Sequence, residues 1–448
     1  MSRRLYRPAD CSVALALLCA AFLASALSAA EPAAEDYSRI AKEVEANLQH
    51  DVLDKWFPAA VDRQGGGFFE DFAADWSRRE TPERSVVYQS RLTWLSAQAA
   101  LRDPAHAEAY LALTRHGEAF LAEKQWDHER GGFFWAVDVD GRPTKRFGSE
   151  KHAYGIAFGI YASAGNYEAT HDAAALELAK KAFRWLDEHA HDPRNGGYFE
   201  ALTAAGEPVL AATLRPADAI GTRYGYKSMN THIHLLEALA GLYAVWPDPA
   251  LRTRLDEVFQ IVRDKIYVPP GCLHLYFNPD WRPLPEFDSF GHDIETAYLL
   301  TEAAAILGKP DDAAAWTAAR HLVDHALEYG FDSEQGGFYN EGTTFGRDVT
   351  KQKIWWVEAE GLNSLLLMHE RFGRETPRYW EAFLKQWDFI SHKQVDADHG
   401  GWYSTVGPDG AAPVNQPKSD RWTEGYHQGR ALMNVSAALH RLADSKSK

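Results

Sequence analysis

Cysteine and positive charge are scarce in this chain, and each shortage excludes a class of protein. Three of the 448 residues are cysteine, and two of them, Cys11 and Cys19, fall in an N-terminal segment that we expect to be removed. Cys272 then stands alone, which excludes an intrachain disulfide and favours a small buried hydrophobe over a nucleophile. Asp and Glu number 63 against 47 Lys and Arg, for a net charge of −16. Because phosphate binding needs a basic surface, nucleic acid is a poor partner.

Long apolar runs are confined to the N-terminus. The chain begins with an arginine-rich stretch, continues with an apolar run from Val13 to Leu27, and then has small residues before Glu31. This is the pattern of a secretory signal peptide, and the run is short for a membrane span. We therefore predict a signal peptide at residues 1–30, one catalytic domain at 31–448, a periplasmic or secreted location, and no membrane association after cleavage.

Several catalytic signatures are also missing. No serine nucleophile elbow, phosphate loop or dinucleotide fingerprint falls on a suitable strand and helix. No cluster of histidine and cysteine has the spacing of a zinc site. His232 and His234 are two residues apart, so on a helix they point about 200° away from each other and cannot share one ion. The sequence thus predicts no metal in the site.

Aromatic residues and a repeated element are abundant. The 15 Trp, 19 Tyr and 22 Phe offer flat faces that suit sugar rings, or simply an aromatic core. A Gly-Gly-aromatic element recurs about every 65 residues, with one interval of about twice that length. Its second glycines are Gly67, Gly132, Gly197, Gly337 and Gly401. Since a degenerate copy, Gly271-Cys272-Leu273, lies within the long interval, the chain contains six units.

Each element is followed by two segments with apolar residues at helical spacing. The twelve predicted helices span about 36–56, 84–101, 104–124, 151–167, 171–189, 229–245, 248–265, 291–307, 310–328, 354–372, 375–390 and 423–442. Links within a unit are short and force antiparallel neighbours, whereas links with the glycine element run to about twenty-five residues. We predict an all-α fold, an (α/α)6 barrel with short β-hairpin loops at one rim, in preference to an open superhelix, which would expose its terminal faces.

Polar and aromatic groups cluster at the start of every second predicted helix. Alternate helices form the inner wall of such a ring, so the six groups should meet beside the long loops, where a pocket is expected. In chain order they are Arg91 with Trp94, Lys151 to Tyr154, Asn230 to Glu237, Gly291 to Glu295, Trp355 to Glu360, and Glu424 to Arg430.

Histidines in these groups have a chemical and a structural interpretation. His292 and Glu295 are three residues apart and share a helix face, so Glu295 is placed to orient the imidazole. His427 and Arg430 have the same spacing, and the cation would lower the pKa of the imidazole. For each histidine taken alone, a polar core residue is the commoner role.

The other groups also leave two interpretations open. Trp356 with Glu360 one turn beyond suits a stacking wall with a hydroxyl acceptor beneath it, or a core position. Arg91 suits the stabilisation of a developing enolate oxygen, or a buried pair with a glutamate.

Four stretches, in this order, resemble the N-acylglucosamine 2-epimerase superfamily, and within it the cellobiose 2-epimerase group. They are Met229 to Glu237, Gly291 to Glu295, Trp355 to Glu360, and Tyr426-His427. The resemblance implies an (α/α)6 barrel, chemistry without a dissociable cofactor, and reversible conversion of glucose to mannose configuration at the reducing end of a mono- or disaccharide.

The resemblance also assigns site residues. It implies proton transfer by His292 and His427, with His234 as a third essential histidine. The substrate-binding positions that it implies are Arg91, Tyr154, Asn230, Glu295, Trp356, Glu360 and Trp422. The stretch from Glu424 to Gln428 departs from the family pattern, and export is unusual for the family. Both departures bear on the substrate more than on the reaction.

The chemistry fits these residue types. A sugar's C2 proton becomes acidic once the ring opens to an aldehyde, and histidine serves as acid and base near pH 7. Inversion at C2 requires two bases on opposite faces of a flat enediolate, and His292 and His427 lie on different inner helices.

The alternatives to a 2-epimerase are an aldose–ketose isomerase, a sugar-binding protein, or a glycoside hydrolase on the same toroid. The hydrolase needs two carboxylates, available among Asp293, Glu295, Glu358, Glu360 and Glu424. Oligomeric state is not predicted.

Overall fold

The computed structural model describes residues 32–447 apart from 82, 213–214, 285–286 and 344–349. The predicted signal peptide lies outside the described residues. Within those ranges, no helix combines the length and the apolar character that a membrane crossing requires.

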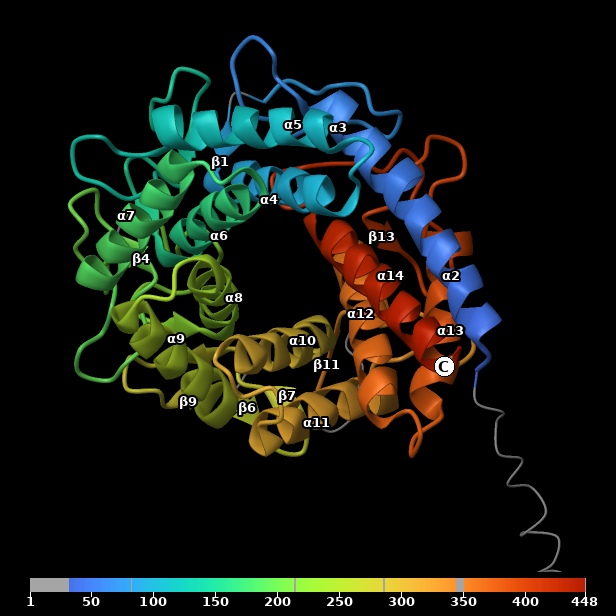
Figure 1. Cartoon of the computed structure of the whole chain (residues 1–448). Helices are drawn as coiled ribbons and strands as arrows, with labels where there is room; N and C mark the ends of the chain where they lie inside the picture. Colours follow the sequence, from blue (N-terminus) through green and yellow to red (C-terminus); the bar gives the residue numbers. More distant parts are fainter. Residues whose placement is uncertain (1–31, 82, 213–214, 285–286, 344–349, 448) are drawn as a thin grey trace, which may run out of the picture.

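Six helices form a closed inner ring (Figure 1). Each contacts the next along the chain, and the last contacts the first. They are α4 (Val86–Arg102), α6 (Ala153–Thr170), α8 (Met229–Val245), α10 (Phe290–Ile306), α12 (Trp355–Phe372) and α14 (Tyr426–Lys446). Their residues are buried on nearly all sides, because each helix packs between neighbours and an outer layer. The predicted (α/α)6 barrel and its six inner helices are confirmed.

The outer layer consists of amphipathic helices. These are α2 (Ala34–Asn47) with α3 (Asp54–Ala60), α5 (Ala107–Phe120), α7 (Ala173–His189), α9 (Pro249–Ile261), α11 (Ala313–Tyr329) and α13 (Arg378–Phe389). Four π-helical segments extend this layer: η1 (Leu48–Leu53), η2 (Leu121–Gln125), η3 (Val262–Ile266) and η4 (Ile390–Gln394). Asp172, Asp248 and Asp312 accept hydrogen bonds from backbone N–H groups in the first turns of α7, α9 and α11, which fixes where these helices begin.

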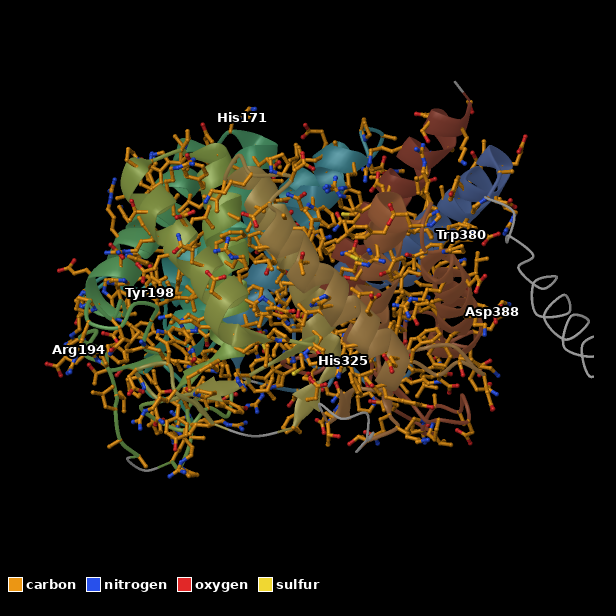
Figure 2. The ribbon with its side chains drawn as sticks, turned by 90° about the horizontal axis from the view of Figure 1, so that it is seen from below. His171, Arg194, Tyr198, His325, Trp380 and Asp388 are labelled. Carbon is orange, nitrogen blue, oxygen red and sulfur yellow. The ribbon has the colours of Figure 1, made fainter. Side chains whose placement is uncertain are left out.

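Short antiparallel strand pairs join neighbouring units at one rim. The pairs are β1 (Arg84–Ser85) with β2 (Ala136–Val137), β3 (Lys151–His152) with β4 (Ala201–Leu202), β5 (Lys227–Ser228) with β8 (Tyr276–Phe277), β10 (Asp288–Ser289) with β11 (Glu341–Gly342), and β12 (Lys353–Ile354) with β13 (Thr405–Val406). A bridge between Phe72 and Ser419 closes the sixth junction. The fourth unit adds β6 (Tyr267–Val268), β7 (Cys272–Leu273) and β9 (Pro283–Leu284). Figure 2 shows the loops and strands gathered at one end of the helices.

A buried ion pair recurs beneath the glycine loops. In five of the six units, an aspartate before the glycines binds a cation that precedes the inner helix of the same unit. The pairs are Asp62–Arg84 (3.1 Å), Asp127–Lys151 (2.8 Å), Asp192–Lys227 (2.8 Å), Asp332–Lys353 (2.9 Å) and Asp396–Lys418 (2.5 Å). Each aspartate also accepts backbone N–H groups two and three residues further on. The pairs therefore fasten the loops to the inner ring.

Candidate active site

A cavity of about 240 Å³ lies where the inner helices begin. Nine of the ten predicted site residues line it: Arg91, Tyr154, Asn230, His234, His292, Glu295, Trp356, Trp422 and His427. The tenth, Glu360, is hydrogen-bonded to His427. A neighbouring cavity of about 190 Å³ shares Ile220, Asn230, His292 and Trp356 with the first. Together they fall within the range of about 300–1,000 Å³ that is usual for small-molecule sites.

His427 enters this cavity from the first turn of α14, with one ring nitrogen held. Its Nδ1 lies 2.7 Å from Oε1 of Glu360. A carboxylate accepts, so Nδ1 carries the proton and Nε2 keeps its lone pair. Burial lowers the pKa of His427 well below its usual value; Glu295 opposes this, whereas the cations Arg91 and Arg430 add to it. His427 is thus a neutral imidazole with a basic Nε2.

His292 stands in the first turn of α10, and its Nδ1 lies 2.6 Å from Oγ of Ser289. Burial lowers its pKa to about 4, although Glu295 opposes the shift. The expectation that Glu295 orients His292 is therefore wrong: Ser289 makes that contact. The Trp356 indole packs against both histidines, with ring centroids 4.8 Å from His292 and 5.6 Å from His427.

His234 and His232 point in different directions, as their spacing on a helix predicts. His234 lines the cavity, with its Nδ1 3.0 Å from Oε2 of Glu237. His232 lies against the glycine loop of the third unit, where its Nδ1 bonds the Ser228 carbonyl (2.7 Å) and its Nε2 accepts the N–H of Tyr198 (3.0 Å). Burial lowers the pKa of His232 to about 3. His232 is therefore a structural residue.

Arg430 connects the partners of two of these histidines. Its Nη2 donates to Glu295 (2.7 Å) and Glu360 (2.6 Å), and its Nη1 donates to Glu237 and to the Tyr426 hydroxyl. All are buried. Burial acts to raise the pKa of Glu237, but Arg430 and His234 outweigh it and hold the pKa at about 2. One guanidinium thus binds both carboxylates that hold Nδ1 of His427 and His234, although burial raises the pKa of Glu360 even with Arg430 beside it.

Sequence reasoning missed this arrangement, which we call the Arg430 cluster: Arg430, Tyr426, Glu237, Glu295 and Glu360. The three-residue spacing of His427 and Arg430 predicts only that the cation lowers the pKa of the imidazole. The three glutamates come from three other inner helices, so only the closed ring reveals that one arginine binds them all.

Arg91 forms a buried ion pair with a glutamate, the second of the two roles that the sequence leaves open for it. Its Nη1 donates to Glu424 (2.8 Å) and its Nη2 to the Tyr154 hydroxyl (3.2 Å). Burial raises the pKa of that hydroxyl to about 12, even though Arg91 acts in the opposite direction. Arg91 is thus an ion-paired residue that lines the cavity.

The described residues that line the cavity do not include the two uncommitted carboxylates that a glycoside hydrolase needs. Of the five acids available to a hydrolase, Glu295 alone lines it, and Glu295 is bound to Arg430. Glu358 accepts the N–H of Phe338 and binds Gln386. This arrangement does not provide the acid and base of a glycoside hydrolase.

Glu295, Glu360 and His427 also meet the spacing of a metal site, with one ligand atom of each within 4.8 Å of the others. Arg430 already sets a positive charge against both carboxylates. The residues therefore suit a hydrogen-bonded network better than a metal ion.

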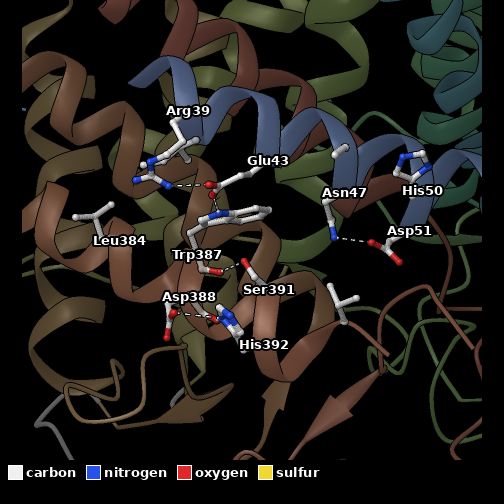
Figure 3. Close-up of a pocket in the computed structure, with 13 residues that line it drawn as sticks. Arg39, Glu43, Asn47, His50, Asp51, Leu384, Trp387, Asp388, Ser391 and His392 are labelled. Carbon is white, nitrogen blue, oxygen red and sulfur yellow. Dashed lines mark hydrogen bonds and ion pairs between the residues drawn. The ribbon is translucent and has the colours of Figure 1, made fainter. Parts of the chain in front are cut away.

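Further cavities lie away from the predicted residues. A groove of about 680 Å³ runs along the outer face between α2 and α13 (Figure 3). Its polar groups pair with one another, as Arg39 and Trp387 do with Glu43. A cavity of about 250 Å³ lies on the other side of the Arg430 cluster, among residues from the last turns of inner helices such as Arg102 and Ile306, together with Glu237 and Arg430.

Comparison with known proteins agrees with this geometry. A family model described as N-acylglucosamine 2-epimerase matches residues 67–431. A cellobiose 2-epimerase of Eubacterium cellulosolvens is 30% identical over 409 residues, 87% of this chain and 96% of the relative. That of Bacteroides fragilis is 29% identical over 395 residues, 88% and 98% of the two chains. The solved cellobiose 2-epimerase of Spirochaeta thermophila is similar with a TM-score of 0.80 and 32% identity, covering 91% of this chain and 98% of that one.

Proposed function

The chain belongs to the N-acylglucosamine 2-epimerase family, and we propose that it acts on a glucose disaccharide such as cellobiose, inverting carbon 2 of the reducing-end unit. As a class it is a carbohydrate 2-epimerase, and thus an isomerase. Two features support the substrate: the relatives that are 29% and 30% identical are named for cellobiose, and two cavities share the wall that contains His292 and Trp356.

One observation carries the proposed mechanism: His427 and His292 both pack on the Trp356 indole and line one cavity. After ring opening, the C1 aldehyde acidifies the C2 proton, and Nε2 of His427 removes it. Glu360, bonded to Nδ1, stabilises the imidazolium that forms. His292, which must be in its protonated form for this step, gives a proton to the opposite face of the enediolate, and the inversion leaves His292 neutral and His427 protonated. Arg91 stabilises the negative oxygens of the intermediate.

Nuclear magnetic resonance in D2O tests the reaction. With cellobiose as substrate, the product should have a mannose unit at the reducing end and solvent deuterium at C2. A ketose product with deuterium at C1 would instead identify an aldose–ketose isomerase. A hydrolysed glycosidic bond would overturn the epimerase mechanism altogether.

We also propose that the enzyme works outside the cytoplasm. The support is the arginine-rich start and the apolar run of residues 13–27. Cell fractionation followed by N-terminal sequencing should find a protein in the periplasm or medium that begins near Glu31. A cytoplasmic protein that retains its leader would contradict the proposal.

A further inference from the structure

The fourth unit reverses the charge of the recurring ion pair. In the first, second, third and fifth units, a lysine or arginine stands two residues before the inner helix. In the fourth, that place belongs to Asp288, in β10. The acidic partner is missing as well. In the other units the aspartate comes directly after the residue that pairs with the aromatic position of the glycine loop. In the fourth unit that residue is Tyr267, paired with Leu273, and Val268 comes after it. A carboxylate thus replaces a cation with no compensating change in the loop.

Two further ligand-type side chains meet Asp288. Asp293 comes from the first turn of α10, and His325 comes from α11, near its loop end (Figure 2). Nδ1 of His325 lies 3.4 Å from Oδ2 of Asp288 and 4.0 Å from Oδ2 of Asp293. The relative exposures of Asp288, Asp293 and His325 are 2%, 0% and 4%. We call these three residues the fourth-unit cluster.

The carboxylates of this cluster lack a lysine or arginine partner within the described ranges. By donor–acceptor geometry none of their four oxygens has a hydrogen-bond partner there, although the two carboxyl groups lie close enough to share a proton and the N–H groups of Ser289 and Leu273 also act on them. No lysine or arginine of those ranges forms an ion pair with these carboxylates within 4 Å, whereas His325 of the same ranges does. Burial raises the pKa of Asp293 well above its usual value, and the neighbouring charge of Asp288 adds to the shift. Two buried carboxylates without a cation are costly.

Two comparable clusters are compensated from within the chain. In the cluster of His152, Glu200 and Asp218, His152 lies 3.0 Å from Asp218, and Glu200 accepts the N–H of Ser228. In the cluster of Glu295, Glu360 and His427, Arg430 supplies the charge. In each of these two clusters one carboxylate oxygen, that of Glu200 or of Glu360, lacks a partner, whereas in the fourth-unit cluster all four carboxylate oxygens do.

We propose that Asp288, Asp293 and His325 bind one divalent metal ion, with Zn²⁺ the best match to the ligand set. One ligand atom from each lies within 4.8 Å of the others. Zinc bonds of about 2.0–2.2 Å place neighbouring ligands of a tetrahedral site about 3.3–3.6 Å apart, so the cluster needs little movement to close on the ion. The two positive charges balance the two carboxylates, as lysine balances aspartate in the other units.

The ion would serve the fold and not the sugar chemistry. None of its three ligands lines the active-site cavity. The ligands lie at the start of α10 and on α11, so the ion fastens the fourth unit where the other units use an ion pair. This inference departs from the metal-free expectation, because the three ligands are not close in sequence.

Metal analysis of the purified, tag-free protein tests the site. After incubation with Zn²⁺ and dialysis, elemental analysis should find one ion per chain. A strong chelator should remove it and lower the melting temperature, and added Zn²⁺ should restore both. Asp288→Asn with Asp293→Asn, and separately His325→Ala, should abolish the bound ion.

Asp127→Asn is the matched control, because it removes a buried rim carboxylate that Lys151 already neutralises. It should lower the melting temperature and still bind one zinc. The proposal fails if the wild type holds no ion and is indifferent to chelator. It also fails if the double variant is more stable than the wild type, as expected for a carboxyl pair that shares a proton. Chelation of the wild type decides the matter even if a variant does not fold.

Discussion

At the scale of single residues, each working imidazole uses one nitrogen for the substrate and one for the protein. Glu360 binds Nδ1 of His427, Glu237 binds that of His234, and Ser289 binds that of His292. These contacts between Nδ1 and the protein set the orientation of each ring and the position of its proton.

Loss of either proposed base should stop the reaction. We expect His427→Ala and His292→Ala each to lower kcat by about 10²–10⁴-fold, the usual contribution of a general acid or base, while binding of the sugar is largely kept. Initial rates and calorimetric binding measure the two effects. His232→Gln is the control, because Gln89 accepts the Phe68 N–H in the first unit just as His232 accepts that of Tyr198. If either alanine variant kept most of its rate, the two-base mechanism would be wrong.

The pH dependence should reflect the lowered pKa of His427. A base is active when neutral, and a lowered pKa extends that form to more acidic pH. We therefore expect the fall of kcat/KM that reports protonation of His427 to lie below the usual histidine pKa of about 6.5. A pH–rate profile measures this. An acid limb centred near the usual value would show that His427 is not the base, or that its positive neighbours do not act on it.

At the scale of elements, the recurring ion pair fastens a glycine loop to the inner ring in five units. Lys227 Nζ binds Asp192, the Gly196 carbonyl and the Pro279 carbonyl, so one side chain ties strand β5 to two loops. Burial would raise the pKa of Asp192, but Lys227 and Asn195 hold it at about 2. Because this pKa is depressed, the stabilisation is complete above about pH 4 and is lost as the pH falls toward 2.

Removal of that lysine should leave a buried charge unpaired. We expect Lys227→Met to lower the free energy of unfolding by about 3–5 kcal/mol, measured by denaturant titration. Lys227→Met with Asp192→Asn should recover part of the loss, because the stranded charge is then absent. An additive double variant would show that the two side chains do not interact.

Local patterns predicted the helices well, because each has an apolar face with helical spacing. The lengths of the links then determined antiparallel neighbours and closure. What failed depends on distant partners: Glu295 shares a face with His292, yet Arg430, from a helix far along the chain, binds it instead. The fourth unit is a second example, since neither Asp288 nor His325 indicates the other in the sequence.

At the scale of the molecule, ring closure unites the ends of the chain. The last helix, α14, contacts both α2 and α4, and it also contains His427 and Arg430. The parts that complete the site are therefore synthesised last, so the site can assemble only when the ring does.

The Arg430 cluster also divides the axis of the barrel. The sugar cavity lies on one side of it and the cavity of about 250 Å³ on the other. Because the Arg430 cluster blocks the axis of the barrel, a saccharide must leave the cavity through the opening by which it entered. Departing product and arriving substrate then compete for a single entrance, and each epimer should be a strictly competitive inhibitor of the other's conversion. The active site therefore has a single entrance. In a mixture of the two epimers, the net rate of conversion depends on their ratio in solution.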